Sequence, residues 1–257
     1  MLIAPVKLRI DKLLVERGLV PSRERAQAMI LAGRVLVNGQ KVEKSGASVG
    51  DDAEIRLLGD DLKYVSRGGL KLEAALDHWK IILNGRICVD VGASTGGFTD
   101  CMLQRGAAEV IAVDTGYGQI AAKLRSDPRV KLLEKTNARY LSREHLQRFD
   151  PGRNVSFIAL DVSFISVTLV LPAVFNAALA ASRAAVREMI TLIKPQFEVG
   201  RESVGKGGIV KDEQAQHRAV IKVHEAVEKL GGNNLEIIES PIPGMEGNRE
   251  FLLYAEF

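Results

Sequence analysis

Features that would narrow the function at once are scarce in this sequence. It has only two cysteines, Cys88 and Cys101, which excludes a disulfide-built domain, and we expect both thiols to be buried in a reducing compartment. The four histidines lack the Cys/His spacing of a metal site, so we expect no bound metal. The apolar start Met1–Pro5 is too short for a signal peptide, and we expect a cytoplasmic protein.

Long hydrophobic runs are almost absent as well. Residues 162–182 carry no charge, and this length is close to the ~20 residues needed to span a bilayer. The run contains Pro172 and Asn176 and follows a strand that ends in Asp161. We therefore interpret it as a loop and a buried helix, and expect no stable membrane association. A membrane span is the alternative.

Positive charge is in excess only at one end of the chain. Residues 1–50 hold nine Lys/Arg and four Asp/Glu, whereas the remainder holds 26 and 28. A basic excess confined to the N-terminal fifth indicates a surface that meets a polyanion. The alternative is an ordinary solvated basic face.

The first fifty residues are predicted to form a small α+β module. Apolar spacing predicts helices over 9–18 and 22–32, and strands over 34–37 and 53–58, and we expect Ser22 to cap the second helix. Asn38-Gly39 is typical of a two-residue hairpin turn, because both residues must adopt positive φ. The candidate RNA-binding residues are Arg9, Lys12, Arg23, Arg25, Arg34 and Lys41, with Arg67 beyond the module.

Residues 87–100 are predicted to form a buried strand, a glycine-rich turn and the start of a helix capped by Thr99 or a neighbour. A dinucleotide site requires glycine where Ser94 stands. A carboxylate such as Asp90 beside the turn suits a cationic ligand such as S-adenosylmethionine better than a diphosphate. Asp114, on the next strand, is placed to accept hydrogen bonds from the ribose of either cofactor. A plain packing turn is the alternative.

From residue 66 onward strands and helices alternate, which predicts an α/β fold with a mostly parallel, doubly wound, Rossmann-like sheet. We assign 1–59 to the N-terminal domain, 60–65 to a linker and 66–257 to the larger domain. Strands are expected near 87–92, 109–114, 130–135, 155–161, 188–194, 235–240 and 250–257. Helices are expected near 70–79, 98–106, 118–125, 142–149, 167–182 and 212–230.

The strand ends carry the candidate chemistry, because ligands of such sheets bind beyond the carboxyl ends. The segment 161–164 lacks the Pro-Pro-aromatic step of amino-methylating enzymes, and neither cysteine is near it for attack on a pyrimidine carbon. What remains is charged: Asp161, Lys194, Lys71 and Glu250. Lys71 opposes the dipole of its helix, which hints at a role. Two ion pairs that only join strand ends are the alternative.

Two resemblances add to these patterns. The runs Arg9–Leu14, Ser22-Arg23 and Val37–Gly39 resemble the alpha-L RNA-binding domain of ribosomal-protein type, which implies a surface that positions structured RNA. Five segments resemble FtsJ-type 2′-O-methyltransferases, and the two-domain order resembles the TlyA (hemolysin A) family of rRNA methyltransferases. These segments are Ser66–Lys71, Asp90–Asp100, Asp161–Ser166, Lys194–Glu198 and Gly247–Phe251.

The TlyA resemblance implies an rRNA (cytidine-2′-O)-methyltransferase that uses S-adenosylmethionine and acts on ribosomal RNA or ribosomal subunits. It implies a catalytic tetrad of Lys71, Asp161, Lys194 and Glu250; Glu246 is close by but fits the motif less well. The implied cofactor-binding residues are Asp90, Gly92, Ala93, Ser94, Thr95, Gly96, Gly97, Phe98, Asp114, Asn137 and Ala138. The competing interpretations are a membrane-active hemolysin-like protein, an inactive RNA-binding protein and a small-molecule O-methyltransferase.

Lys194 is the candidate proton acceptor or alkoxide stabiliser for a ribose 2′-hydroxyl. Burial and Lys71 favour its neutral form, whereas Asp161 and Glu250 favour the ammonium, and the sequence leaves both roles open. The glycine-rich segment 200–208 is basic; it is either a loop that closes over RNA or an ordinary connection.

Overall fold

The computed structural model describes residues 7–20, 22–58, 63–149, 154–181, 188–244 and 247–257. The chain divides into two compact units, Met1–Asp61 and Leu62–Phe257, and each is considered by itself. Residues 60–62 of the predicted linker lie outside the described residues. The following residues belong to the second unit, where Tyr64 is buried and donates a 2.8 Å hydrogen bond to Glu73.

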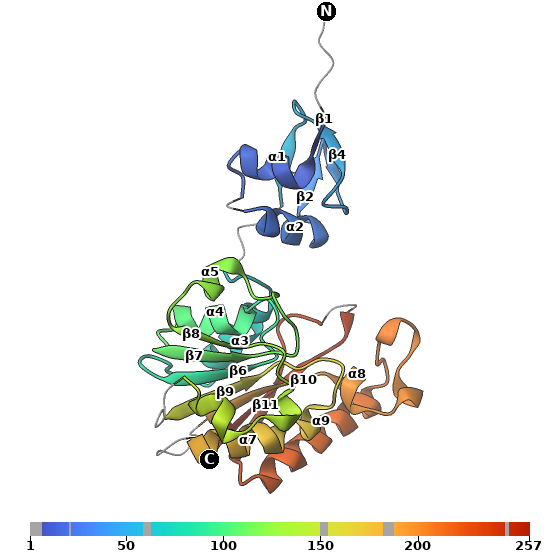
Figure 1. The fold of residues 1–257 in the computed structure, drawn as a ribbon. Coiled ribbons are helices and arrows are strands. Elements are labelled where there is room, and N and C mark those ends of the chain that lie inside the picture. The colour runs from blue at the N-terminus through green and yellow to red at the C-terminus, as the bar shows by residue number, and fades with distance from the viewer. Residues whose placement is uncertain (1–6, 21, 59–62, 150–153, 182–187, 245–246) are drawn as a thin grey trace, which may run out of the picture. The chain divides into compact units, whose positions relative to one another are not determined.

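The N-terminal unit packs two helices on two small sheets. Its elements are β1 (Lys7–Arg9), α1 (Ile10–Glu16), α2 (Arg23–Leu31), β2 (Val35–Val37), β3 (Gln40–Lys41), β4 (Ser48–Gly50) and β5 (Ile55–Leu57) (Figure 1). Ser22 caps α2 by accepting the Arg25 N–H, and Asn38 and Gly39 have φ of 51° and 79°, so both predictions are confirmed. The β1–β4 pair was not predicted, because strands this short show no readable alternation.

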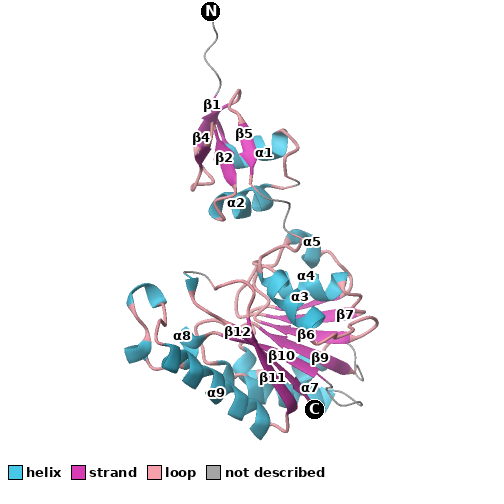
Figure 2. Cartoon of the chain, turned by 180° about the vertical axis from the view of Figure 1, so that it is seen from behind, coloured by secondary structure: helices cyan, strands magenta, loops and turns pink. Residues whose placement is uncertain are grey.

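The second unit contains one seven-stranded sheet in the order β11-β12-β10-β9-β6-β7-β8 (Figure 2). Strand β12 runs in the opposite direction to the other six, which are parallel to one another. The predicted doubly wound sheet is therefore confirmed. The strands are β6 (Ile87–Val91), β7 (Glu109–Val113), β8 (Val130–Leu133), β9 (Val155–Leu160), β10 (Glu188–Ile193), β11 (Asn233–Glu239) and β12 (Phe251–Glu256).

Helices cover both faces of this sheet. The helices are α3 (Gly68–His78), α4 (Gly97–Gln104), α5 (Ala122–Arg125), α6 (Arg143–Gln147), α7 (Leu171–Ala181), α8 (Pro195–Glu198) and α9 (Glu213–Lys229). The shorter 3-10 turns are η1 (Ala138–Tyr140), η2 (Val167–Leu169), η3 (Arg201–Ser203) and η4 (Lys206–Gly208). One apolar cluster joins α3, α4 and α5 to the sheet, and a second joins α6, α7 and α9 to the opposite face.

Alternation along β6 places side chains in both clusters. Val89 and Val91 enter the α7 side, whereas Cys88 enters the α4 side, where Cys101 packs. Both cysteines are buried and free, as expected, and burial raises the pKa of each thiol to about 12. They therefore act as small apolar side chains.

The uncharged run 162–182 forms a loop, the turn η2 and the eleven-residue helix α7. Within the part of the run that is described, Leu171, Val174 and Ala178 of α7 are buried in the sheet core. The loop and buried helix are therefore confirmed. Among the described residues, no helix has the length and apolarity to cross a bilayer.

Candidate active site

Neighbouring strand ends bring the four tetrad candidates to one edge of the sheet. Ile193 of β10 pairs with Phe251 of β12, so the next residue of β10, Lys194, and the residue before β12, Glu250, lie at the same edge. On the other side of β10, β9 runs parallel and ends just before Asp161. The fourth candidate, Lys71, is in the first turn of α3.

The Lys71 ammonium and the Glu250 carboxylate form a buried ion pair. Their side chains are 10% and 3% exposed. The partners are 179 positions apart in the sequence, so the contact joins α3 to the start of β12. Lys71 at the helix start therefore has its own compensating carboxylate. Glu246, the alternative acid, lies outside the described residues.

Lys194 forms the second pair. Its Nζ lies 2.6 Å from Asp161 Oδ1 and donates a 2.8 Å hydrogen bond to Ser163 Oγ. The contact with Oδ1 is an ion pair without the alignment of a hydrogen bond, since Oδ1 has no hydrogen-bond partner. Asp161 Oδ2 lies 3.9 Å from the position of a Cβ on Gly68, which places this pair beside the start of α3.

The glycine turn after β6 brings two chain segments together. Gly92 has φ of 87°, and a Cβ there would overlap the backbone carbonyl of Asp161. Ser94 and Gly96 also have positive φ, of 48° and 96°. The predicted cap is wrong: Gly96 occupies the N-cap without a side-chain bond, and Thr99 donates instead to Asp90.

Asp90 is the most deeply placed acid of the site. It is fully buried; its Oδ2 accepts a 2.6 Å hydrogen bond from Thr99 Oγ1, while Oδ1 has no partner. Burial raises the pKa of Asp90 to about 7, and the nearby charge of Asp161 adds to the increase, against the opposing hydrogen bond from Thr99. An unpartnered buried oxygen indicates a place for a donor or a cation.

Asp114 lies at the end of β7. Its Oδ2 accepts the Ser94 N–H at 2.8 Å and its Oδ1 accepts the Gly116 N–H at 2.6 Å. A carboxylate has about four acceptor positions, so it can still bind hydroxyl groups. The cavity beside it holds about 10 Å³ and is lined by Ala93, Ser94, Ala112, Asp114, Gly116, Gln119, Ile120, Leu132 and Glu134.

The other cofactor candidates divide into two groups. Ala93 and Phe98 are buried, the Thr95 carbonyl accepts the Ala121 N–H, and Gly97 lies against Ser66 and Gly69. These surround the turn. The Asn137–Ala138 turn is different, because Asn137 caps η1 by accepting the Arg139 N–H and neither residue lines the small cavity.

Of the candidate RNA-binding residues in the N-terminal unit, Arg9 and Arg23 share a partner. Arg9 and Arg23 both donate to Asp11, which is fully buried, and they hold the pKa of Asp11 well below its usual range, Arg9 most strongly. Lys12 on α1 and Lys41 on β3 are exposed and lie outside this cluster. The others are Arg25 and Arg34, which are half-buried, and Arg67, which is exposed at the start of α3 in the other unit.

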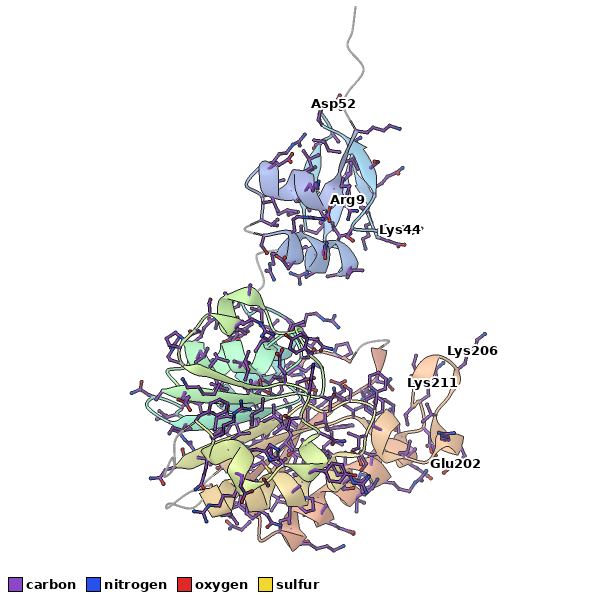
Figure 3. All side chains as sticks on the ribbon, in the orientation of Figure 1. Arg9, Lys44, Asp52, Glu202, Lys206 and Lys211 are labelled. Atoms are coloured by element: carbon purple, nitrogen blue, oxygen red, sulfur yellow. The ribbon has the colours of Figure 1, made fainter. Side chains whose placement is uncertain are left out.

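The segment 200–208 forms the turns η3 and η4 and exposes Lys206 (Figure 3). It is tied to the Glu250 segment, because Asn248 donates to the Gly208 carbonyl and accepts the Val210 N–H. This contact places the segment next to the site.

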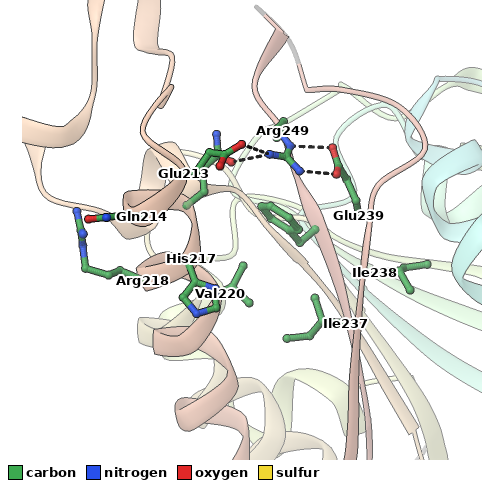
Figure 4. Close-up of a pocket in the computed structure, with 11 residues that line it drawn as sticks. Glu213, Gln214, His217, Arg218, Val220, Ile237, Ile238, Glu239 and Arg249 are labelled. Carbon is green, nitrogen blue, oxygen red and sulfur yellow. Dashed lines mark hydrogen bonds and ion pairs between the residues drawn. The ribbon is translucent and has the colours of Figure 1, made fainter.

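A larger groove of about 740 Å³ lies between α9, β11 and β12, and no member of the tetrad lines it (Figure 4). Arg249 lies across it and pairs with Glu213 and Glu239. The groove is lined by two acids, Glu213 and Glu239, and by two arginines, Arg218 and Arg249, so it has no excess of positive charge from these residues and is a poor candidate for binding RNA.

Three side chains at the site were not among the candidate site residues. Ser163 was quoted only within a motif and Thr99 was predicted only as a helix cap, and their hydrogen bonds to Lys194 and Asp90 depend on the fold. Phe164 is 92% exposed and has φ of 63°. An aromatic residue next to Asp161-Val162-Ser163 was the available signal, because a large exposed ring beside a polar site indicates binding.

Comparison with known proteins agrees with this geometry. The FtsJ-like methyltransferase family profile matches residues 64–257, and the S4 domain profile matches residues 8–55. The fold and the site thus define a methyltransferase joined to an S4 domain. The chain belongs to the TlyA family within the FtsJ-like methyltransferases.

Three relatives support this membership. The "16S/23S rRNA (cytidine-2'-O)-methyltransferase TlyA" of Mycobacterium tuberculosis is 44% identical over 96% of this chain and 89% of its own. The "Putative rRNA methyltransferase YqxC" of Bacillus subtilis is 45% identical over 96% of this chain and 85% of its own. A solved "Putative hemolysin from Streptococcus thermophilus" is 41% identical, with a TM-score of 0.72, and the match covers 99% of this chain and 89% of that one.

Proposed function

We propose that this protein transfers a methyl group from S-adenosylmethionine to the ribose 2′-oxygen of a cytidine in ribosomal RNA. The observation that carries the proposal is the pair of lysine–carboxylate contacts at adjoining strand ends, Lys194 with Asp161 and Lys71 with Glu250. The nucleotide class comes from the relatives, whose names specify cytidine 2′-O-methylation of rRNA. The S4 domain supports RNA as the partner.

The residues around the glycine turn fit S-adenosylmethionine. The unpartnered Asp90 oxygen would hold its cationic part, and Asp114 would accept hydrogen bonds from its ribose hydroxyls. Apolar Ile120 and Leu132 would cover the adenine. Since the cavity has room for about one water, side chains that line it must move apart before the cofactor binds. When bound, the cofactor supplies an electrophilic methyl group.

Lys194 acts on the developing charge of the 2′-oxygen. The Lys194 ammonium donates one hydrogen bond to Ser163 and is paired with Asp161, so N–H donors remain for the substrate. A positioned cation stabilises an alkoxide most where water is excluded, and the Lys194 side chain is only 11% exposed. This geometry favours the charge-stabilising role over the role of base. The 2′-hydroxyl proton would then pass to Asp161, whose Oδ1 accepts no hydrogen bond, and from there to solvent. Lys71 and Glu250 hold α3 against the same edge.

Phe164 gives the site a surface for the base. Its ring is exposed and packs at 5.3 Å from the Phe197 ring, three residues after Lys194. Aromatic side chains stack on unpaired bases, with about 1–3 kcal/mol for each base. Stacking on Phe164 would therefore hold the target nucleotide while its ribose meets Lys194.

The decisive experiment is to incubate the protein and labelled S-adenosylmethionine with each ribosomal subunit and with naked rRNA, and then map the label. We expect one or a few cytidines that carry a 2′-O-methyl group, and no label with the Lys194→Ala variant. Label on a base or on a small molecule would contradict the proposal. The hemolysin name of one relative is addressed by assaying the same preparation for lysis of lipid vesicles, where we expect none.

A further inference from the structure

A buried carboxylate outside the tetrad connects the two segments that carry Asp161 and Lys194. Glu198, at the end of α8, has a side chain only 2% exposed. Its Oε1 accepts the Val167 N–H at 2.7 Å, and its Oε2 accepts the Ser166 hydroxyl at 2.5 Å. Glu198 therefore joins the turn after β10 to the far end of the loop after β9.

The positive charge that balances this carboxylate comes from a third element. Lys222 of α9 lies 3.2 Å from Glu198 Oε2 and donates to the Glu198 carbonyl at 2.9 Å. It also donates to the Ser166 hydroxyl at 3.2 Å. A buried charge is tolerated when it is paired and hydrogen-bonded, and Glu198 meets both conditions.

The contact is placed to control geometry at the site. Lys194 begins the single turn of α8 and Glu198 ends it. The facing loop leaves β9 at Asp161, and its middle contacts Lys194 through Ser163 and Phe197 through Phe164. Glu198 holds the far end of the loop at Ser166 and Val167.

We propose that Glu198 is a positioning residue that sets the distance between Asp161 and Lys194, with Lys222 as its counter-ion. The inference rests on the proposed function and adds to it. In the described contacts Glu198 touches neither Asp161 nor Lys194, so it acts through the loop after β9 and the turn after β10. A displacement of about 1 Å at reacting groups can cost up to about 100-fold in rate. Loss of the carboxylate therefore lowers kcat rather than cofactor binding.

The test compares Glu198→Gln with Glu228→Gln, an exposed glutamate on α9, in the full-length protein with ribosomal subunits as substrate. We expect Glu198→Gln to lower kcat about 10- to 100-fold, with the KM for S-adenosylmethionine and the Tm nearly unchanged. The control should keep wild-type kinetics. Wild-type kcat in Glu198→Gln, or a parallel loss of Tm and cofactor binding, overturns the positioning role.

A double-mutant cycle separates positioning from general support. In an Asp161→Asn background, measured by single turnover, Glu198→Gln should cost less than about threefold, because the pair that it positions is already broken. An undiminished effect overturns the proposal.

If Glu198→Gln does not fold, Ser166→Ala removes one bond of the same contact, and its kcat should fall about threefold through the loss of one hydrogen bond. Wild-type protein that fails to methylate RNA would instead overturn the proposed function.

Discussion

The two units of the chain use charge in opposite ways. In the N-terminal unit one buried carboxylate, Asp11, holds Arg9 and Arg23, whose side chains remain 47% and 46% exposed. In the methyltransferase unit both members of the pair Lys71–Glu250 are enclosed, at 10% and 3% exposed. Exposed cations offer their charge to a partner, whereas enclosed pairs fix the geometry of a site.

This difference sets the expected cost of losing a charge. An exposed cation contributes to RNA binding through a salt-screened attraction that adds up over many contacts. A buried pair behaves as a unit, because removing one partner leaves the other without compensation. Replacing a lysine by alanine should therefore change activity strongly at the strand ends and change RNA binding only slightly on α1.

The largest effect is expected from Lys194→Ala. Without the ammonium, nothing on the described strand ends replaces the donor next to Ser163, so methyl transfer should fall at least about 10³-fold. The affinity for S-adenosylmethionine, measured by calorimetry, should stay nearly intact. Lys229→Ala, on the exposed side of α9, is the matched control. A fully active Lys194→Ala enzyme would remove Lys194 from the mechanism.

Lys71→Met tests whether the enclosed pair also stabilises the fold. The variant leaves Glu250 buried and unpaired, and we expect the free energy of unfolding to fall by about 3–5 kcal/mol. Urea denaturation measures the loss. Adding Glu250→Leu should restore much of the stability without restoring activity. If the double variant is active, the pair serves only the fold.

Contacts between residues that are close in the sequence could be predicted more fully than contacts between distant residues. The contacts of Asp11 are local, within 16 residues. The N-terminal module was predicted from apolar spacing, from Ser22 as a helix cap and from the Asn38-Gly39 turn. The tetrad members were found through motifs, but their pairing spans 179 positions for Lys71–Glu250 and depends on the strand order. The roles of Thr99 and Glu198 could not be predicted, because both follow from contacts between segments.

Phe164→Ala probes the exposed part of the second unit. Loss of the stacking surface should lower kcat/KM for ribosomal subunits by about 10- to 100-fold, in line with about 1–3 kcal/mol per stacked base. Phe164→Trp should retain most activity, since it preserves a flat ring. The binding of S-adenosylmethionine alone is the control and should not change. Equal activity of the alanine variant would mean that the base is held elsewhere.

Asp90→Asn tests the buried carboxyl through pH. Burial raises its pKa from 3.8 to about 7, so the carboxyl stabilises the cofactor-free fold at low pH, and this contribution is lost as pH rises through about 7. The Tm of the wild type should therefore fall between about pH 4 and 7 relative to Asp90→Asn and stay level above that range. Affinity for the cationic cofactor should change in the opposite direction and rise over the same range. If the curves of Tm against pH are parallel for the wild type and Asp90→Asn, Asp90 does not titrate in this pH range.

The smallest effect is expected from Lys12→Ala on the N-terminal unit. Lys12 is exposed on α1 and lies outside the Asp11 cluster, so we expect its loss to remove one phosphate contact and to leave the fold intact. The affinity for rRNA should fall a few fold, and the slope of log affinity against log salt should decrease by about 1. Filter binding at several salt concentrations measures both. A loss of kcat with unchanged RNA affinity would break the contrast between the units, because an exposed cation would then act on the chemistry itself.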